Sequence, residues 1–421
     1  MFDEIRFLLE SGQPEKYAHI PTLEIHIAIL RNFILAEGIP VLEIPPTPAG
    51  FDFVCCLTHD VDFLGIRNHR FDHTMFGFLY RAVIGSLINL VKKKISWKQM
   101  LENFRAVLLL PAVYLGIIQD FWITFDKYMQ IEKDLRSTFF FLPYKNYSGN
   151  RLNGKRAARR ASKYDIIDAK QHVEYLMARG CEIGLHGIDA WNGVEKGLKE
   201  FDRISSLTGR SDLGVRMHWL YFNSESPMVL EKAGFLYDST YGYNNSVGFR
   251  AGTSQVFRPL STERLLELPL QIQDTALFYS NRMGLDEDSA LELCRMLFRI
   301  NSMYGGGVVI NWHHRSIAPE RLWGEFYEKL LHHLREYRVW FGTAGEVVCW
   351  FDKRRKVQFE EVKLKNGGLK VKICGQEGFS GPDLILRLYK PRLPSYGDSE
   401  ETVNSFNDVL VRDSDTTEIS F

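Results

Sequence analysis

The chain has 421 residues, of which 45% are hydrophobic and 25% charged, and its 52 basic side chains are balanced by 52 acidic ones. These proportions are ordinary for a soluble globular protein that can bury a large core. A formal net charge of zero gives no support to a nucleic-acid partner, which would require a clustered basic surface. We therefore expect no nucleic acid among the partners.

The cysteines and the first residues bear on the cellular compartment. The cysteines form no CxxC pair and no zinc-ribbon spacing; they are Cys55, Cys56, Cys181, Cys294, Cys349 and Cys374. We interpret them as free thiols, most of them buried. The opening MFDEIRFLLESG carries acids and lacks the basic start and apolar run of a secretory signal. A reducing, cytoplasmic location is the resulting expectation.

Apolar runs and helical patterns alternate along most of the chain. Residues 1–50 are predicted to form a helical lead that ends at IPPTPAG (44–50). The predicted strands are FVCCL (53–57), STFFFL (137–142), EIGL (182–185), LGVR (213–216), LLELPL (265–270) and VVINW (308–312). The predicted helices are 163–179, 227–233, 288–304 and 319–337. This alternation predicts an α/β fold with a parallel sheet, either a barrel or an open doubly wound sheet.

Three segments lie outside this alternation. Residues 63–130 contain two apolar stretches, 75–91 and 106–118, neither of which has 18 uncharged apolar residues. They are interpreted as a helical insertion packed on the sheet or, alternatively, as a surface (75–118) that enters a membrane interface beside Lys92–Lys94. Residues 355–393 predict a small β-domain with a hairpin turn at Asn366–Gly368. Residues 394–421 are polar and acidic and are predicted to be disordered.

Ionisable side chains follow several of the predicted strands. They are Asp60 and Asp62 after the first strand, His186 and Asp189 after EIGL, Arg216 and His218 after LGV, Asp274, and His313. Because the carboxyl ends of parallel strands meet at one rim, these groups are expected to converge. One of the two aspartates could hold a divalent metal while the other removes a proton from water, and His313 could protonate a leaving group. Amide hydrolysis requires such a set.

Four motifs give these residues a family resemblance. LTHDVD (57–62), EIGLHGIDAWN (182–192), GVRMHW (214–219) and VVINWHH (308–314) occur in the order of the motifs of polysaccharide deacetylases, the NodB-like or carbohydrate esterase family 4 proteins. STFFFLPYKN (137–146) is similar to a further strand of that family, and residues 233–260 are typical of one bacterial subgroup. The resemblance covers roughly residues 51–350. It implies a distorted (β/α) barrel that hydrolyses N-acyl, usually N-acetyl, amino sugars.

The resemblance also implies roles for particular residues. Asp60 would be the base, Asp62 and His186 metal ligands, and Arg216 the side chain that positions the base. His313 would be the acid, oriented by Asp274. The cofactor would be a divalent metal, zinc in this family. The spacing D-x-D in LTHDVD looks closer to the related deformylases that act on lipid-linked sugars, and with the apolar insertion it suggests a lipid-linked carbohydrate substrate at the inner face of the membrane.

One position departs from the family pattern. The second metal histidine of the HxxxH motif should stand at position 190, which is Ala190. Asp189 or His59 could supply the missing ligand, another metal could be used, or the site could have lost catalysis. Two other classes of function therefore stay open: an inactive barrel that binds a glycan or a partner protein, and a metal-independent glycoside hydrolase with two carboxylates.

Overall fold

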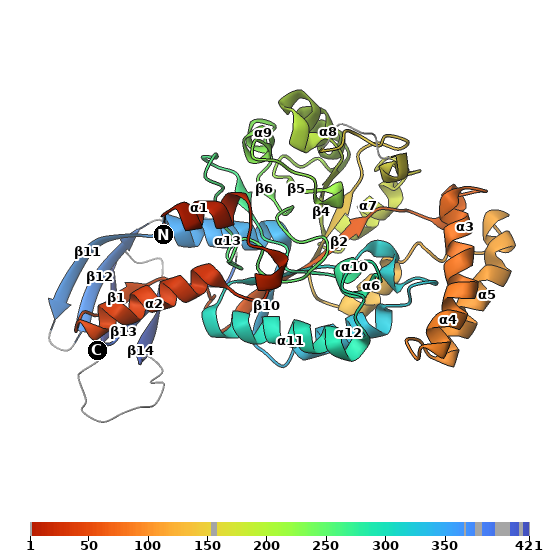
Figure 1. Cartoon of the computed structure of the whole chain (residues 1–421). Helices are drawn as coiled ribbons and strands as arrows, with labels where there is room; N and C mark the ends of the chain where they lie inside the picture. Colours follow the sequence, from red (N-terminus) through yellow and green to blue (C-terminus); the bar gives the residue numbers. More distant parts are fainter. Residues whose placement is uncertain are drawn as a thin grey trace.

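The computed structural model describes residues 2–152, 158–365, 368–374, 381–391, 405–411 and 416–420. Its centre is a curled sheet of parallel strands (Figure 1). These strands are β2 (Phe53–Val61), β3 (Ser137–Phe141), β4 (Glu182–Gly187), β5 (Gly214–Met217), β6 (Tyr237–Asp238), β7 (Leu266–Glu267), β8 (Ile272–Gln273) and β9 (Gly307–Asn311). β10 (Val339–Phe341) pairs with the start of β2.

The strands follow one another around a ring in chain order. From β2 to β7 each strand pairs with the next, and β9 returns to pair with β2. β7 and β8 belong to one short segment that pairs with β6 through its first part and with β9 through its second. Pro269, between them, has no N–H to give to a ladder, which interrupts the predicted strand 265–270. The ring is a distorted (β/α) barrel, as predicted.

Alternation along β2 separates the inside of the barrel from the outside. Val54 and Cys56 share a buried cluster with Phe140 and Val309 of neighbouring strands, so they point inward. Phe53, Cys55 and Leu57 belong instead to the core that packs against the surrounding helices. Because side chains alternate at every residue, Thr58 and Asp60 continue the inward series toward the carboxyl end of the strand. The backbone of β2 thus brings Asp60 to the rim.

Helices precede, surround and follow this ring. The α-helices are α1 (Phe2–Glu10), α2 (Thr22–Ala36), α3 (His73–Tyr80), α4 (Ser86–Val91), α5 (Trp97–Tyr114), α6 (Phe125–Glu132), α7 (Lys170–Met177), α8 (Val194–Thr208), α9 (Ser226–Lys232), α10 (Asp274–Phe278), α11 (Glu287–Tyr304), α12 (Gly324–Leu334) and α13 (Ala344–Lys356). Short helical turns are η1 (Glu15–Tyr17), η2 (Ile66–Asn68), η3 (Arg81–Gly85, a π-turn), η4 (Ala158–Arg160), η5 (Ala190–Asn192), η6 (His218–Leu220) and η7 (His314–Ile317).

Two predicted helices begin later than expected. The pattern at 319–337 becomes α12 only from Gly324, because Glu320 and Leu322 have left-handed backbone angles (φ 81° and 57°). The pattern at 163–179 becomes α7 only from Lys170, because the Asp165 side chain accepts the backbone N–H of Ile167 at 3.0 Å and holds a turn. The polar helices α8 and α13 were not predicted.

The predicted insertion is helical. α3, η3 and α4 form one nearly continuous stretch that packs on α5 through a small core of Met75, Phe78, Ala82, Ala106 and Leu110. These helices stand at one end of the molecule (Figure 1). By length and composition alone, the 19-residue stretch His73–Val91 could cross a membrane, and 28% of its apolar window is buried.

Two small antiparallel sheets occupy the opposite end (Figure 1). One consists of β1 (Val41–Glu43), β13 (Leu384–Tyr389) and β14 (Phe406–Val411), and the other of β11 (Gln358–Lys365), β12 (Gly368–Cys374) and β15 (Thr416–Ser420). The sheet of β1, β13 and β14 therefore includes a strand, β1, from residues 1–50, which were predicted to be helical.

β14 and β15 correct the prediction that 394–421 is disordered. β14 alternates exposed with partly buried residues, as an edge strand does, so its polar composition is compatible with pairing. Asn366 and Gly367 of the predicted turn lie outside the described residues, as do 394–404. The described cysteines Cys55, Cys56, Cys181, Cys294 and Cys349 are free thiols.

Candidate active site

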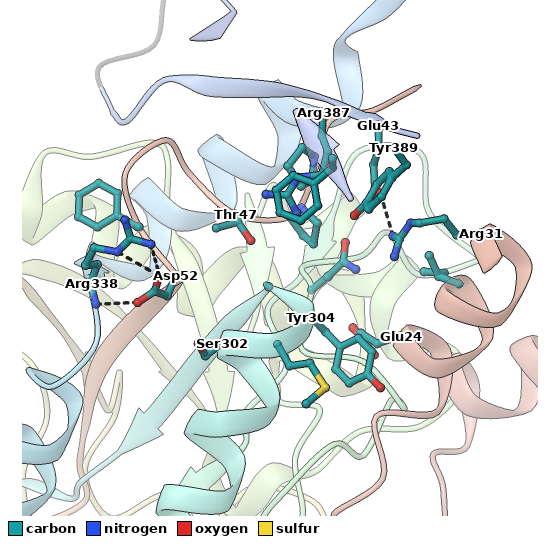
Figure 2. Close-up of a pocket in the computed structure, with 18 residues that line it drawn as sticks. Glu24, Arg31, Glu43, Thr47, Asp52, Ser302, Tyr304, Arg338, Arg387 and Tyr389 are labelled. Atoms are coloured by element: carbon teal, nitrogen blue, oxygen red, sulfur yellow. Dashed lines mark hydrogen bonds and ion pairs between the residues drawn. The ribbon is translucent and has the colours of Figure 1, made fainter. Parts of the chain in front are cut away.

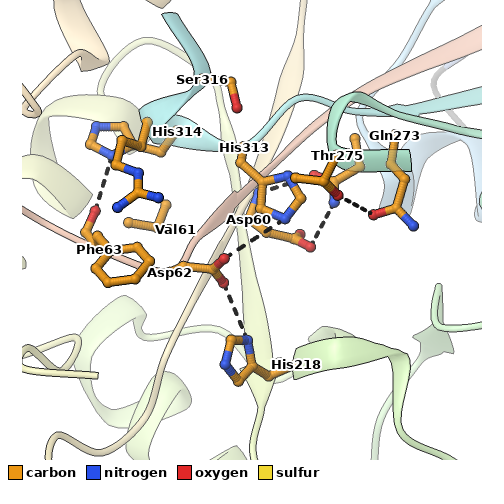
Figure 3. Close-up of polar contacts among 12 residues, drawn as sticks. Asp60, Val61, Asp62, Phe63, His218, Gln273, Thr275, His313, His314 and Ser316 are labelled. Atoms are coloured by element: carbon orange, nitrogen blue, oxygen red, sulfur yellow. Dashed lines mark hydrogen bonds and ion pairs between the residues drawn. The ribbon is translucent and has the colours of Figure 1, made fainter. Parts of the chain in front are cut away.

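The carboxyl ends of β2, β4 and β5 bring three ligand-type side chains together. Asp62 Oδ1 lies 3.2 Å from His186 Nε2 and 3.2 Å from His218 Nδ1, and the two imidazole nitrogens are 3.0 Å apart. Figure 3 shows Asp62 between His218 on one side and His313 on the other. Among the described residues, Asp62, His186 and His218 form the one group of His, Cys, Asp and Glu with a geometry that could hold a metal ion.

The separations fit a tetrahedral metal. Ligand atoms 2.0–2.1 Å from a zinc ion in tetrahedral geometry are about 3.3 Å apart, close to the distances found here. His186 Nδ1 lies 3.0 Å from the carbonyl oxygen of Arg216, which can only accept, so Nδ1 carries the proton and Nε2 presents its lone pair. An aspartate and two imidazoles with one open position form a ligand set typical of catalytic zinc.

The charges and the burial of the triad favour the ligand forms of Asp62 and His218. Burial alone would raise the pKa of Asp62, but His218 and His186 hold it well below its usual range. Burial lowers the pKa of His218 to about 4. At neutral pH the carboxylate is therefore ionised and this imidazole is neutral, as metal binding requires.

Asp60 lies beside the triad and is held by two donors. Its Oδ1 accepts from Arg216 Nη1 at 3.1 Å and its Oδ2 from Asn311 Nδ2 at 2.7 Å. Arg216 is fully buried and is itself fixed by bonds to Thr58 Oγ1 (2.7 Å) and Ser239 Oγ (2.8 Å). Burial would raise the pKa of Asp60, but His186, Arg216 and His313 keep it below its ordinary value. Asp60 is therefore an ionised and rigidly oriented carboxylate.

His313 faces the same cavity from the end of β9. Its Nδ1 lies 2.6 Å from Asp274 Oδ1, and its backbone N–H donates to Asp274 Oδ2 at 2.7 Å. Burial would lower the pKa of His313, but the charge and hydrogen bond of Asp274 raise it. Nε2 points to the triad, 3.8 Å from Asp62 Oδ2. Asp274 thus fixes the ring of His313 and favours its protonated form, which can give up a proton.

Two residues considered as replacements for the missing histidine lie elsewhere. The Asp189 carboxylate accepts from Tyr147 Oη (2.6 Å) and the backbone N–H of Asn150 (2.7 Å), so it holds a loop. His59 points outward from β2, with its Nδ1 2.8 Å from the carbonyl oxygen of Trp312 and its Nε2 2.9 Å from Glu132. Neither joins the triad.

His218 completes the triad where Ala190 offers no ligand. The sequence placed His218 at the rim without a role. Like Asp60 and Asp62, Arg216 and His218 are two residues apart, and this spacing puts both side chains on one side of an extended chain. The same argument could have assigned His218. Its neighbours Trp219 and Leu220 adopt left-handed angles (φ 66° and 53°), so the chain turns back immediately after the ligand.

A cavity of about 310 Å³ opens over these groups. Asp60, Asp62, His186, His218 and His313 all line it. Trp219, which is 40% exposed, also lines the cavity and offers an aromatic face. Five arginines also line it, namely Arg159, Arg160, Arg282, Arg315 and Arg321.

A second cavity of about 250 Å³ lies between the N-terminal segment, the end of α11 and the sheet of β1, β13 and β14 (Figure 2). Four of its charged side chains form two ion pairs: Arg338 with Asp52 at 2.6 Å, and Arg31 with Glu43 at 2.8 Å. The first pair joins the residues that precede β10 and β2, and the second joins α2 to β1, so we assign the cavity no chemistry.

Comparison with known proteins was made at three levels. No protein-family model matches the sequence, and no curated protein is significantly similar to it. Solved structures do match. A protein assigned as a polysaccharide deacetylase from Mycobacterium smegmatis is 16% identical, with 74% of this chain and 95% of that chain covered and a TM-score of 0.44. One assigned likewise from Pseudomonas aeruginosa PAO1 is 14% identical, with 71% and 90% covered and a TM-score of 0.44.

An allantoinase structure is 14% identical, with 72% of this chain and 92% of that chain covered, also at a TM-score of 0.44. The chain is thus similar to polysaccharide deacetylases, the class that its motifs resemble, and to an allantoinase. These likenesses are distant, and function must be inferred from the site itself.

Proposed function

We propose that the protein is a metal-dependent hydrolase that removes an N-acyl group, N-acetyl in the simplest case, from an amino sugar. The observation that carries the proposal is the placement of an ionised carboxylate (Asp60) and a proton-bearing imidazole (His313) beside the Asp62–His186–His218 triad. A base, an acid and a cation site in one cavity are what amide hydrolysis needs.

Asp62, His186 and His218 would hold a divalent cation, for which zinc is our first choice. When bound, this cation supplies Lewis-acid polarisation of the amide carbonyl and lowers the pKa of water. Asp60 accepts the proton of the water whose oxygen adds to the carbonyl carbon. His313 then donates its Nε2 proton to the sugar nitrogen as the C–N bond breaks. The products are a carboxylic acid and a free amine. Asp60 then holds a proton that His313 has lost, and return of that proton restores both groups for the next cycle.

Trp219 gives the proposed substrate a binding surface. Its indole lines the cavity and is partly exposed. Aromatic faces bind the apolar faces of sugar rings by burying C–H groups, and an indole offers more area than any other side chain. Stacking of the sugar on Trp219 would set its N-acyl group toward Asp60 and His313.

Replacement of Asp60 tests the assignment of the base. Asp60→Asn keeps the shape of the side chain and its contact with Arg216 but cannot take a proton, so deacylation of an identified substrate should fall at least about 100-fold. Metal content, measured by elemental analysis, should stay unchanged. Full activity of this variant would rule out the proposed mechanism.

Two observations bear on the competing functions. A glycoside hydrolase would need a second free carboxylate in the cavity besides Asp60, and Asp62, which also lines it, is bound to His186 and His218. Asp274 is fully buried and held by His313, and it does not line the cavity. An inactive, glycan-binding barrel is expected to have lost part of its site, whereas the triad, the base and the acid all stand together here. We therefore favour an enzyme.

We further propose that the insertion lies on the inner face of a membrane. Phe76, Tyr80, Ile84, Leu87 and Val91 form an exposed stripe at helical spacing on the side of α3–α4 that faces away from α5. Leu101 and Leu108 of α5 are exposed too, and the exposed Lys92–Lys94 follow α4. An apolar stripe beside a lysine cluster suits a membrane with anionic headgroups.

Vesicle flotation tests this placement. The full chain should float with vesicles that contain anionic lipid, and Leu87→Ser with Val91→Ser should reduce the bound fraction several-fold. A matched double substitution at exposed apolar positions outside the insertion, Ile29→Ser with Leu260→Ser, should not. Equal flotation of the two double variants would contradict membrane contact through α3–α5.

A further inference from the structure

The arginines of the active-site cavity are not used by the proposed chemistry. Arg282, Arg315 and Arg321 line the cavity on the side of His313, from the segment after α10 and from the segment between β9 and α12. Arg160 differs from them because its guanidinium donates to the carbonyl oxygens of Ser148, Ile188 and His218 and so holds the backbone. Arg159 stands next to Arg160 in the chain, so Arg282, Arg315 and Arg321 are the arginines on the side of His313 that could bind a ligand.

Arg315 is more than nine-tenths buried, yet its donors are not satisfied within the described part of the chain. Its Nε and Nη1 have no hydrogen-bond partner there, and its nearest carboxylate, Glu320, lies 3.6 Å from Nη2. The rings of Phe63 and Trp122 lie 4.3 and 4.4 Å from the guanidinium carbon. Rings can cover the faces of a guanidinium, but its N–H donors lie in the plane and still need acceptors.

The surrounding charges leave the cavity positive. Glu320 is shared, because it also pairs with Arg81 at 2.8 Å and lies 4.0 Å from Arg321. Asp60 is bound to Arg216, and Asp274 to His313. Burial lowers the pKa of Arg315 to about 10, which leaves it charged at neutral pH. Buried guanidinium N–H groups without an acceptor are costly, so an anionic ligand that accepts from Nε and Nη1 of Arg315 would be stabilised in this place.

Resting on the proposed function, we infer that the substrate carries a phosphate or diphosphate ester next to the N-acylated sugar, bound by Arg282, Arg315 and Arg321. Arginine forks match phosphate oxygens in pairs and supply several donors at once. Arg321 Nη1 donates to Ser316 Oγ at 2.9 Å and Arg282 Nη1 to Thr275 Oγ1 at 2.7 Å. These neutral partners orient the two guanidinium groups without cancelling their charge.

The place of Arg315 also relates the phosphate to the insertion. Trp122, which stacks on Arg315, belongs with Ala318 to the buried core of the insertion. Arg81 of η3 reaches Glu320, and Asn103 Oδ1 of α5 accepts from the Glu320 backbone N–H at 2.6 Å. The arginines therefore lie between the catalytic groups and the helices with the exposed apolar stripe. A sugar, a phosphate and a lipid joined in that order would fit this arrangement, and a nucleotide-linked sugar shares the same phosphate chemistry.

Calorimetric titration with inorganic pyrophosphate tests the site without any hydrolysis. The full chain is first stripped of metal with a chelator, since a bound cation would itself attract phosphate. We expect the dissociation constant for pyrophosphate to rise at least tenfold in Arg282→Gln and in Arg315→Lys. Arg282 is partly exposed, so its replacement should leave the fold intact. Arg299→Gln, an exposed arginine on α11 that pairs with Glu292, is the matched control and should bind as the wild type does. Binding equal in all variants, or none in the stripped wild type, would overturn the inference.

A comparison of substrates shows whether the phosphate belongs to a lipid or to a nucleotide. It also tests the phosphate site separately from the proposed hydrolase function. KM should be at least tenfold lower for an N-acetylated sugar on a polyprenyl diphosphate or a nucleoside diphosphate than for a neutral N-acetylated oligosaccharide, and Arg282→Gln should remove the difference. Preference for the polyprenyl form in vesicles would identify the lipid as the source. Hydrolysis of the phosphate-linked sugars with a KM that Arg282→Gln leaves unchanged would refute the inference while the proposed function stood. Pyrophosphate binding that depends on the arginines, without hydrolysis of any N-acylated sugar, would refute the proposed function while the phosphate site stood.

Discussion

The imidazole of His218 meets the metal triad through its Nδ1, while His186 uses Nε2. The two nitrogens reach the same point because the rings come from adjacent strands and cross nearly at right angles, with 76° between their planes. Each ligand thus depends on a different strand end, and removal of one should leave the other two in place. The triad can be tested one residue at a time.

His218→Ala should lower the bound zinc from about one per chain to a small fraction, because three protein ligands are the usual requirement for a catalytic site. Activity should fall at least about 100-fold with it. Elemental analysis of the purified variant provides the measurement. Asp189→Asn is the matched control, since Asp189 follows β4, as the ligand His186 does, but binds Tyr147 and Asn150, and it should keep its metal. Loss of metal in Asp189→Asn with full metal content in His218→Ala would instead identify Asp189 as the third ligand.

Asp274 acts on the reaction through His313, and its replacement should separate positioning from metal binding. Asp274→Asn keeps one acceptor for the ring but removes the negative charge that stabilises the imidazolium, so kcat should fall about 10- to 100-fold. KM and metal content should change little, because neither the cavity wall nor the triad is altered. An unchanged kcat would show that His313 does not deliver the proton.

At the scale of elements, α2 is attached to the barrel through a buried acid. Glu24 Oε1 accepts from Thr253 Oγ1 at 2.5 Å and from the backbone N–H of Ser254 at 3.2 Å. Burial raises the pKa of Glu24 from 4.5 to about 7. In the folded state this group therefore keeps its proton up to about pH 7, while in the unfolded chain it loses the proton near pH 4.5. Its contribution to stability consequently falls as pH rises through this window.

Glu24→Gln should remove this pH dependence. Above pH 7.5 the variant should be more stable than the wild type, by about 1–3 kcal/mol, since the wild type then carries a buried charge. At pH 5 the two should differ little. Urea unfolding of both proteins at the two pH values gives the difference directly. Lower stability of the variant at high pH would show that the ionised form is well solvated in the cavity of Figure 2.

The elements differ in how well the sequence predicts them, for physical reasons. β2, β3, β4 and β9 are buried throughout, so their apolar runs stand out. β6, β7 and β8 have two residues each, too few for any periodicity. β14 was mistaken for disorder because an edge strand needs little apolar surface. In the site, the strand-end rule brought Asp60, Asp62, His186, Arg216, Asp274 and His313 to one rim, whereas it could not show that Asp189 turns into a loop.

At the scale of the whole molecule, metal binding and folding are linked. The ligands come from β2, β4 and β5, so the site exists only when the barrel is closed, and the unfolded chain has no equivalent. A ligand that binds the native state alone stabilises it by RT ln(1 + [L]/Kd), about 2.7 kcal/mol at 100 times Kd. For a chain of 421 residues, with an unfolding entropy of about 2.1 cal/mol/K per residue, each kcal/mol shifts Tm by about 1 °C.

Removal of metal with a chelator should therefore lower the Tm of the wild type by several degrees, and added zinc should restore it. His218→Ala should have the lower Tm at the outset and show no response to either treatment, while Asp189→Asn should respond as the wild type does. Differential scanning fluorimetry of the three proteins, with and without chelator, is sufficient. A response that survives in His218→Ala would place the stabilising metal elsewhere in the chain, because a site left with Asp62 and His186 alone binds a cation too weakly to move the unfolding transition.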